Sequence, residues 1–219
     1  MGDFSAISNG LLRLRLAKSR VKVFGSEGHM FACNATLSES VVREFEAQYR
    51  IVLPVDYRSF LLEVGNGGAG PAYGLFPLGM EDGGTGDGPR PWYENDGFVG
   101  NLAAPFPHRR PWNDLAGKPE YKEELEDDSS WEDEYQRKKG LWEQVYWATA
   151  NVNGAIPICH LGCAMRQWLV ITGPEAGNVW DDNRADYGGL KPTQCGTRKR
   201  TTFLQWYKTW LEDALRQLE

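Results

Sequence analysis

Apolar residues recur at helical spacing in several stretches of the chain. The spacing over residues 1 to about 20 favours an amphipathic helix, although the alternation from Leu12 to Leu16 is also typical of a strand. Ser38 suits the N-cap of a second helix, and Thr201 or Thr202 suits the N-cap of a final one. The apolar positions that define these helices are Phe4, Ile7, Leu11, Val42, Phe45, Tyr49, Phe203, Trp206, Tyr207, Trp210, Leu211, Ala214 and Leu218.

The segment from Leu53 to Leu78, LPVDYRSFLLEVGNGGAGPAYGLFPL, contains the start and end of a helix and then a strand-like run. Pro54 suits the first helical position, and Asp56 places a carboxylate in the first turn, where it faces the positive end of the helix dipole. Residues 65–68 can take positive φ and so end the helix. The run 73–76 predicts a strand that enters a sheet. Because these glycines follow a helix, whereas a phosphate cradle uses amides at a helix start, we expect no nucleotide site here.

Three short β-prone runs occupy the last third of the chain. They are residues 155–158, 168–172 and 178–180, and the glycine-containing turn between the last two predicts a hairpin. Residues 21–31 have no clear period and are expected to form a loop with at most a short strand. The order of helices, strands and a closing helix predicts one α+β domain over residues 1–219.

From about residue 81 to 150 the chain becomes rich in glycine, proline, aromatic and acidic residues, which indicates a variable excursion from this domain. Between Glu120 and Glu134 there are nine acidic residues and one lysine. Their spacing supports either a weak helix or a charged loop. Such a run is typical either of a solvated surface or of a surface that steers a basic partner. The candidate partner-binding residues are Glu123, Glu124, Asp127, Asp128, Trp131, Glu132 and Asp133.

Composition and charge narrow the possible partners. A net charge of −6 argues against direct nucleic-acid binding and favours a basic protein partner. There is no run of about 18 apolar residues, so no membrane partner is expected. Four cysteines are too few for a disulfide framework, and the N-terminal segment lacks the apolar stretch of a secretory signal. We therefore expect a cytoplasmic protein with reduced thiols.

A basic cluster lies near the N-terminus. In so acidic a protein, a solvated face is the favoured interpretation of this cluster over a membrane or nucleic-acid contact. Its members are Arg13, Arg15, Lys18, Arg20 and Lys22.

Cys159, His160 and Cys163 form the densest group of possible metal ligands or nucleophiles. Thiolates and an imidazole this close could fill three positions of a tetrahedral zinc site. The fourth ligand would have to be Cys195, Cys33 or His29. On a strand, Cys159 and His160 would point to opposite faces, so buried structural cysteines are favoured, and we expect no metal or other cofactor.

Other titratable residues lack companions. Asp181, Asp182 and Asp186 do not have EF-hand spacing, so they are expected to form a polar turn or to meet a positively charged partner. His108 is expected on a surface loop. No catalytic constellation emerges, which favours a non-enzymatic protein.

The pattern Leu-Pro-x-Asp-Tyr-x-x-Phe-Leu, then Gly-Asn-Gly-Gly-x-Gly-Pro, then Tyr-Gly-Leu resembles the signature of the SUKH superfamily, the Smi/Knr-like proteins. The similarity extends to residues 9–29, 154–180 and 203–211, so that roughly two thirds of the chain is covered and residues 81–150 are not. The resemblance implies a role in holding the scaffold, and none in catalysis, for Pro54, Asp56, Tyr57, Phe60, Leu61, Gly67, Gly68, Tyr73 and Gly74.

The resemblance also implies a fold and a function. The expected fold is α+β, with a curved, mostly antiparallel sheet flanked by N-terminal helices and a C-terminal helix. Bacterial members resemble immunity proteins of polymorphic toxin systems, non-enzymatic inhibitors that bind a cognate toxin, often a nuclease. The implied function is therefore neutralisation of a basic protein toxin through an acidic, aromatic surface. The alternatives are a Smi/Knr-like regulatory or scaffold protein of cell-wall synthesis and signalling, and a metal or thiol enzyme built on Cys159, His160 and Cys163.

Overall fold

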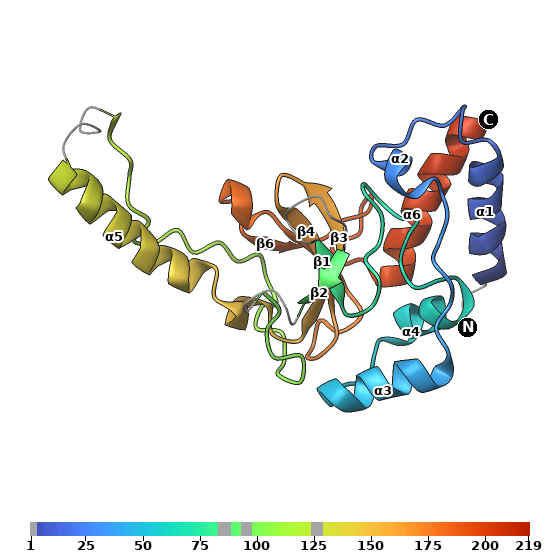
Figure 1. Ribbon diagram of the computed structural model, residues 1–219, viewed down its shortest axis with the longest axis horizontal. Helices are drawn as coiled ribbons and strands as arrows, with labels where there is room; N and C mark the ends of the chain where they lie inside the picture. The colour runs from blue at the N-terminus through green and yellow to red at the C-terminus, as the bar shows by residue number, and fades with distance from the viewer. Residues whose placement is uncertain (1–3, 83–88, 93–97, 124–128) are drawn as a thin grey trace.

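The computed structural model describes residues 4–82, 89–92, 98–123 and 129–219, which form helices and short strands (Figure 1). The α-helices in these ranges are α1 (Phe4–Leu16), α2 (Ser26–His29), α3 (Glu39–Tyr49), α4 (Val55–Glu63), α5 (Ser129–Tyr146) and α6 (Phe203–Leu215). The strands are β1 (Met80–Asp82), β2 (Pro89–Pro91), β3 (Ala155–Gly162), β4 (Met165–Val170), β5 (Val179–Asp182) and β6 (Leu190–Pro192). Short 3-10 turns are η3 (Thr149–Val152), η4 (Arg184–Asp186) and η5 (Arg216–Leu218). The predicted α+β class is confirmed.

The larger sheet is antiparallel and has the strand order β3-β4-β5-β6, while β1 and β2 form a separate antiparallel pair. Trp168 of β4 lies opposite Trp180 of β5, which confirms the predicted hairpin. The register between β3 and β4 shifts twice, once between Pro157 and Cys159 and once between His160 and Gly162. Such irregularities bend a strand and increase its twist.

Alternate residues of the sheet enter two different cores, as the two-residue period of a strand requires. Ile156, Leu169 and Val179 belong to the core shared with the helices. Trp168 and Trp180 belong to a second core. Residues 98–112 cover this second core, with Phe106 buried in it. These residues belong to the segment that was predicted to be a variable excursion, yet Phe106 is part of a core.

Helix α6 packs against α1 and α4. The Phe60 ring of α4 lies 4.7 Å from the Tyr207 ring and 5.3 Å from the Phe203 ring of α6, measured between centroids. The predicted caps are also present. The Ser38 hydroxyl accepts a hydrogen bond from the Val41 amide at 3.4 Å, and Thr202 forms a capping box with Gln205. The amphipathic helices predicted at both ends of the chain are therefore confirmed.

One short helix was missed. Residues 21–31, predicted as a loop, contain the single turn α2. Gly25 and Met30 flank it with left-handed backbone, at φ of 76° and 52°. Four helical residues are too few to produce a periodic pattern, so this turn had no signal in the sequence.

The segment 53–78 folds largely as predicted, with two corrections. Pro54 is the N-cap of α4, one residue before its expected position. The strand predicted at 73–76 is wrong, because Leu75 forms only single bridges, to Gly68 and to Cys159. Pro71 and Pro77 flank this run without amide donors, which limits how far a ladder can extend.

Glycines explain the tight path of this loop. Gly67, Gly68 and Gly74 have φ of 82°, 93° and 94°. A Cβ on Gly74 would collide with the carbonyl oxygen of Gly68. The backbone here approaches itself more closely than any side chain would permit. Tyr57, Phe60 and Leu61 are buried nearby, whereas Tyr73 is 48% exposed.

Helix α5 leaves the rest of the molecule and projects to one side (Figure 1). Only Trp142 and Tyr146, near its C-terminal end, are buried among its 18 residues. We call α5 together with residues 113–123, which lead out to it, the arm. The remaining described residues are called the body.

Candidate partner-binding arm

The outer end of the arm carries three aromatic rings in mutual contact. Trp131 and Tyr135 of α5 stack with centroids 5.3 Å apart, and Tyr121 of the incoming segment lies 5.5 Å from Trp131. Tyr121 lies 5.2 Å from Tyr135 and is 45% exposed. The i, i+4 spacing of Trp131 and Tyr135 places them on the same face of the helix. The arm thus presents a cluster of aromatic rings, and aromatic residues are enriched at protein interfaces.

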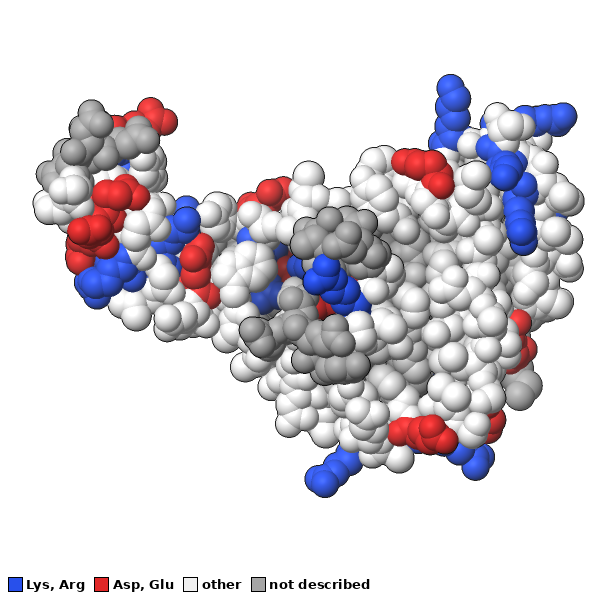
Figure 2. All heavy atoms as spheres, in the orientation of Figure 1, with Lys and Arg blue, Asp and Glu red and all other residues white. Residues whose placement is uncertain are grey.

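Acidic residues adjoin these rings in the chain, and a basic turn follows them. Asp133 is exposed, and Glu132 accepts a hydrogen bond from the Gln136 amide at 2.7 Å. Glu134 binds Arg137 at 2.7 Å and Lys138 at 3.3 Å. The Arg137 hydrogen bond, followed by that of Lys138, lowers the pKa of Glu134 from 4.5 to about 2. Figure 2 shows acidic and basic side chains side by side along the arm.

These positions refine the predicted acidic surface. Glu123, Trp131, Glu132 and Asp133 lie at the outer end of the arm, as one group. Glu124, Asp127 and Asp128 lie outside the described residues. The weak helix was predicted within 120–134, whereas α5 begins at Ser129 and continues to Tyr146. The aromatic members Tyr121 and Tyr135 were not among the predicted site residues, although the i, i+4 spacing from Trp131 could have identified Tyr135.

The inner end of the arm is anchored to the body by aromatic stacking and one buried ion pair. Tyr146 stacks on Trp112 at 5.6 Å, and its hydroxyl donates to Asn113 at 2.8 Å. Arg184 bonds the carboxylate of Asp182 at 2.7 Å, and the side chains of both are 3% exposed. Arg184 also donates to the backbone carbonyl of Tyr146 at 3.3 Å. A guanidinium at the C-terminal end of α5 interacts favourably with the helix dipole.

This anchor corrects the expectation for the aspartates. Asp182 accepts the indole N–H of Trp168 at 3.0 Å as well as the Arg184 guanidinium. Asp181 accepts from Gln167 at 2.9 Å and from Thr193 at 2.5 Å. Both belong to β5, so they do not form the polar turn that was predicted, whereas Asp186 is exposed in η4. The spacing Asp182-x-Arg184 was the available signal for the ion pair.

Apolar side chains remain exposed beside the anchor. Leu141 and Val145 are 53% and 62% exposed, one helical turn apart on α5. They line a shallow hollow of about 280 Å³ together with Asp114, Ala116 and Lys138. The arm therefore offers a second apolar contact surface nearer the body.

The cysteine and histidine group does not converge. The Cys159 thiol is buried and donates to the Pro71 carbonyl at 3.1 Å, whereas Cys163 is exposed. Burial, and then the negative charge of Asp181, raises the pKa of the Cys159 thiol, which disfavours the thiolate needed by a nucleophile. The His160 ring stacks on Tyr73 at 5.6 Å. Among the described residues, no group of three or more His, Cys, Asp or Glu side chains is placed to hold a metal ion.

The remaining candidate ligands have structural contacts. Cys33 contacts the Tyr207 hydroxyl at 3.9 Å, and burial raises the pKa of its thiol. His29 is buried, and its Nδ1 accepts from the Phe31 amide at 3.0 Å. Cys195 is half-buried.

His108 lies on a loop, as predicted, but it is half-buried and has partners, which the sequence did not lead us to expect. It stacks on Trp112 at 5.0 Å, and Phe106 and Trp180 lie against it. This histidine therefore belongs to the second core.

A scan against protein-family models and searches of curated proteins and of solved structures find no match to this chain. None of the helices in the described ranges is both long enough and apolar enough to cross a bilayer.

Proposed function

We propose that this chain is a non-enzymatic, cytoplasmic immunity protein that binds and neutralises a basic protein toxin through the outer end of its arm. The observation that carries the proposal is the arm itself. A long helix buries two of its 18 residues and presents aromatic rings and acidic side chains at its far end. Most helical stability in proteins comes from tertiary packing, so a helix with little tertiary cover gains stability when a partner packs against it.

The chemistry of the outer end suits a positively charged partner. Enzymes that cut nucleic acids have basic clefts, because they must neutralise phosphates. An acidic, aromatic projection can enter such a cleft, where charge complementarity speeds encounter and the rings bury apolar area. The toxin class that fits best is therefore a nuclease.

The assignment to an immunity role rests on the resemblance to the SUKH superfamily. The scaffold role implied for the matching residues is supported by the burial of Tyr57, Phe60 and Leu61 and by the positive φ of three glycines, although Tyr73 is exposed. A scaffold of this kind leaves the variable excursion free to set partner specificity. The arm occupies that excursion.

The experiment is a rescue assay with the product of the neighbouring open reading frame as the candidate toxin. Co-expression of this chain should restore growth of cells that express the toxin. With purified proteins, E132K/D133K should slow association about tenfold at low salt and reduce its salt dependence, because the steering charge is reversed. Stopped-flow measurement of the association rate at two salt concentrations tests this.

A matched control is E44K/E63K, which makes the same change in net charge on exposed residues of α3 and α4. It should leave the rate and its salt dependence near those of the unsubstituted chain. Equal slowing by both variants would show that only net charge matters and would remove the arm from the interface. Failure of the unsubstituted chain to rescue growth against the neighbouring toxin would contradict the immunity role.

A further inference from the structure

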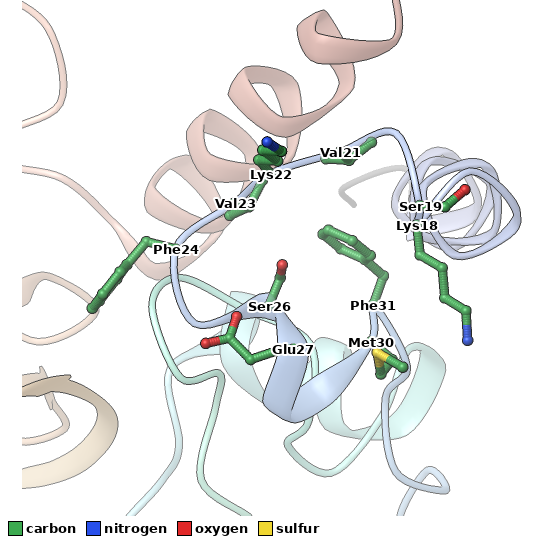
Figure 3. Close-up of a pocket in the computed structure, with 10 residues that line it drawn as sticks. All are labelled: Lys18, Ser19, Val21, Lys22, Val23, Phe24, Ser26, Glu27, Met30 and Phe31. Atoms are coloured by element: carbon green, nitrogen blue, oxygen red, sulfur yellow. The ribbon is translucent and has the colours of Figure 1, made fainter.

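A second surface, at the opposite end of the molecule from the arm, is a hollow of about 690 Å³ formed by residues 18–31. Val21, Val23 and Phe31 make it apolar, and Figure 3 shows Phe31 pointing into it from beside α2. Its charged lining residues are Lys18 and Lys22 together with one acidic residue, Glu27, so that cations are in the majority. We call this surface the basic groove.

The basic groove lies within an electropositive region. Five cations occur in ten residues, all are exposed, and no acidic side chain among the described residues forms an ion pair with any of them. They are Arg13, Arg15, Lys18, Arg20 and Lys22. Figure 2 shows basic side chains projecting from this end of the molecule. The chain as a whole has a net charge of −6, so these five cations without ion pairs in the described part of the chain make this part of the surface opposite in charge to the rest.

Large apolar side chains are exposed beside these cations. Leu16 is 80% exposed, Phe24 is 66% exposed and Met30 is 44% exposed. Phe24 and Met30 line the hollow, and Leu16 follows Arg15 in the chain. Single exposed apolar residues are common, but several of them beside an apolar hollow mark an interaction site. The ligand that fits combines negative charge with apolar side chains.

The outer end of the arm has this chemistry. Trp131 and Tyr121 supply apolar rings, and Glu123, Glu132 and Asp133 supply charge. The arm and the basic groove lie at opposite ends of the molecule, so the contact cannot form within one copy (Figure 1). We propose that the basic groove binds the outer end of the arm of a second copy, so that the protein self-associates head to tail.

The geometry determines what such an assembly looks like. The contact joins two different surfaces, so it either closes into a ring, the smallest being a reciprocal dimer, or continues as a filament. An α5 of 18 residues spans about 27 Å, which is long enough to reach past the surface of its own body. Self-association would also cover the aromatic end of the arm. In that state the surface proposed for the toxin is occupied, and toxin binding competes with self-association.

The test measures the mass of the purified chain alone by sedimentation velocity over a range of concentrations and at two salt concentrations. The unsubstituted chain should associate with concentration, and more weakly at high salt. K18E/K22E and E132K/D133K should each weaken association about tenfold or more, because each places like charges in contact. An equimolar mixture of the two variants should associate again. The acidic arm of K18E/K22E then meets the basic groove of E132K/D133K, and the basic arm of E132K/D133K meets the acidic groove of K18E/K22E.

The matched control is K191E/K199E, which reverses two exposed lysines outside the basic groove. It should associate like the unsubstituted chain. A monomer at every concentration would overturn the proposal, and so would association that both variants retain. Binding of monomeric protein to vesicles of anionic lipid, lost in K18E/K22E, would also overturn it and assign the groove to a membrane surface. These measurements use no toxin, so their failure leaves the rescue assay to decide the immunity role separately.

Discussion

Helices α6 and α5 show how differently the body and the arm are held. Helix α6 buries five of its 13 residues, among them Phe203 and Tyr207, which contact α4. Helix α5 is longer and buries two of its 18 residues. Burial of large side chains stabilises the body by a few kcal/mol each, whereas the surface ion pairs of α5 are individually weak. The body is therefore expected to be the stable unit and the arm the part that a partner completes.

The largest expected effect lies at the junction of these two regions. Arg184→Ala leaves the Asp182 carboxylate buried without its cation and removes a donor from the C-terminal end of α5. Breaking a buried pair by removing one partner costs about 3–5 kcal/mol of unfolding free energy. Urea unfolding followed by circular dichroism measures this loss.

Two further variants sharpen the result. Asp186→Ala, an exposed neighbour in η4, should change stability by less than about 0.5 kcal/mol. The double variant D182L/R184M should be more stable than Arg184→Ala, because it leaves no buried charge unpaired. A loss in Arg184→Ala no greater than in the Asp186 control would mean that the ion pair does not hold the arm to the body.

The next largest effect is on stability and comes from replacing one glycine in each region by alanine. The substitution should destabilise the body and stabilise the arm. Gly74→Ala in the body requires left-handed backbone and meets the Gly68 carbonyl, so it should cost at least about 1–3 kcal/mol. Gly140→Ala in the arm adds a Cβ that meets nothing within 4 Å. It should stabilise α5 by about 1 kcal/mol through helix propensity.

Urea unfolding reports the Gly74 loss, and amide hydrogen exchange of α5 reports the Gly140 gain. Slower exchange confined to the arm is the expected outcome for Gly140→Ala. Faster amide exchange in α5 would contradict the expected gain in helix stability. An equal gain in the unfolding free energy of the whole protein would contradict the idea that the arm unfolds separately from the body.

The smallest effect is a difference in pH dependence. Burial, the largest cause, lowers the pKa of His29 and of His108 below 6.5, so the folded body favours their neutral forms. The unfolded chain takes up these protons first, and stability should fall as pH decreases below about 6.5. In the arm, Glu134 has a pKa lowered from 4.5 to about 2, so its contribution is present above pH 4.5 and is lost as pH falls towards 2.

The urea midpoint should therefore decrease between pH 7.5 and 5.5, and His29→Gln should flatten part of that slope. Helix content of the arm should change only below pH 4.5. An unsubstituted chain with no loss of stability between pH 7.5 and 5.5 would contradict the role of the buried histidines.

Local patterns predicted the elements with regular periods. The stripe of α6 and the β4–β5 hairpin follow from spacing and turn residues that act over a few positions. The prediction of a strand at 73–76 was wrong, because an aromatic and apolar run can also form a single bridge beside β3. The prolines on either side of the run lack amide donors and prevent a longer ladder. The contacts of His108 were also not predicted. Its neighbours Trp112 and Trp180 come together only through the fold.

The candidate site divides in the same way. The acidic run and Trp131 were visible in the sequence because charge and residue type need no structure. The basic turn that follows is equally visible in the sequence, and its pairs with Glu134 are local to the helix. The packing of Tyr121 against the rings and the projection of α5 depend on how separate segments come together. The basic groove is a stronger case, since its five cations had been interpreted as a solvated face. Only the fold places them beside an apolar hollow and exposed apolar side chains.

By itself, the sequence determined which faces of the helices are apolar, where the main caps and the hairpin turn lie, and that the chain is acidic with one acidic and one basic cluster. These properties depend on residue type and on spacings of two to four positions. The tertiary structure alone decided that the two clusters lie at opposite ends of the molecule, that Arg184 anchors the arm, and that only two residues of α5 are buried. Those outcomes depend on packing between residues far apart in the chain, which no local period records.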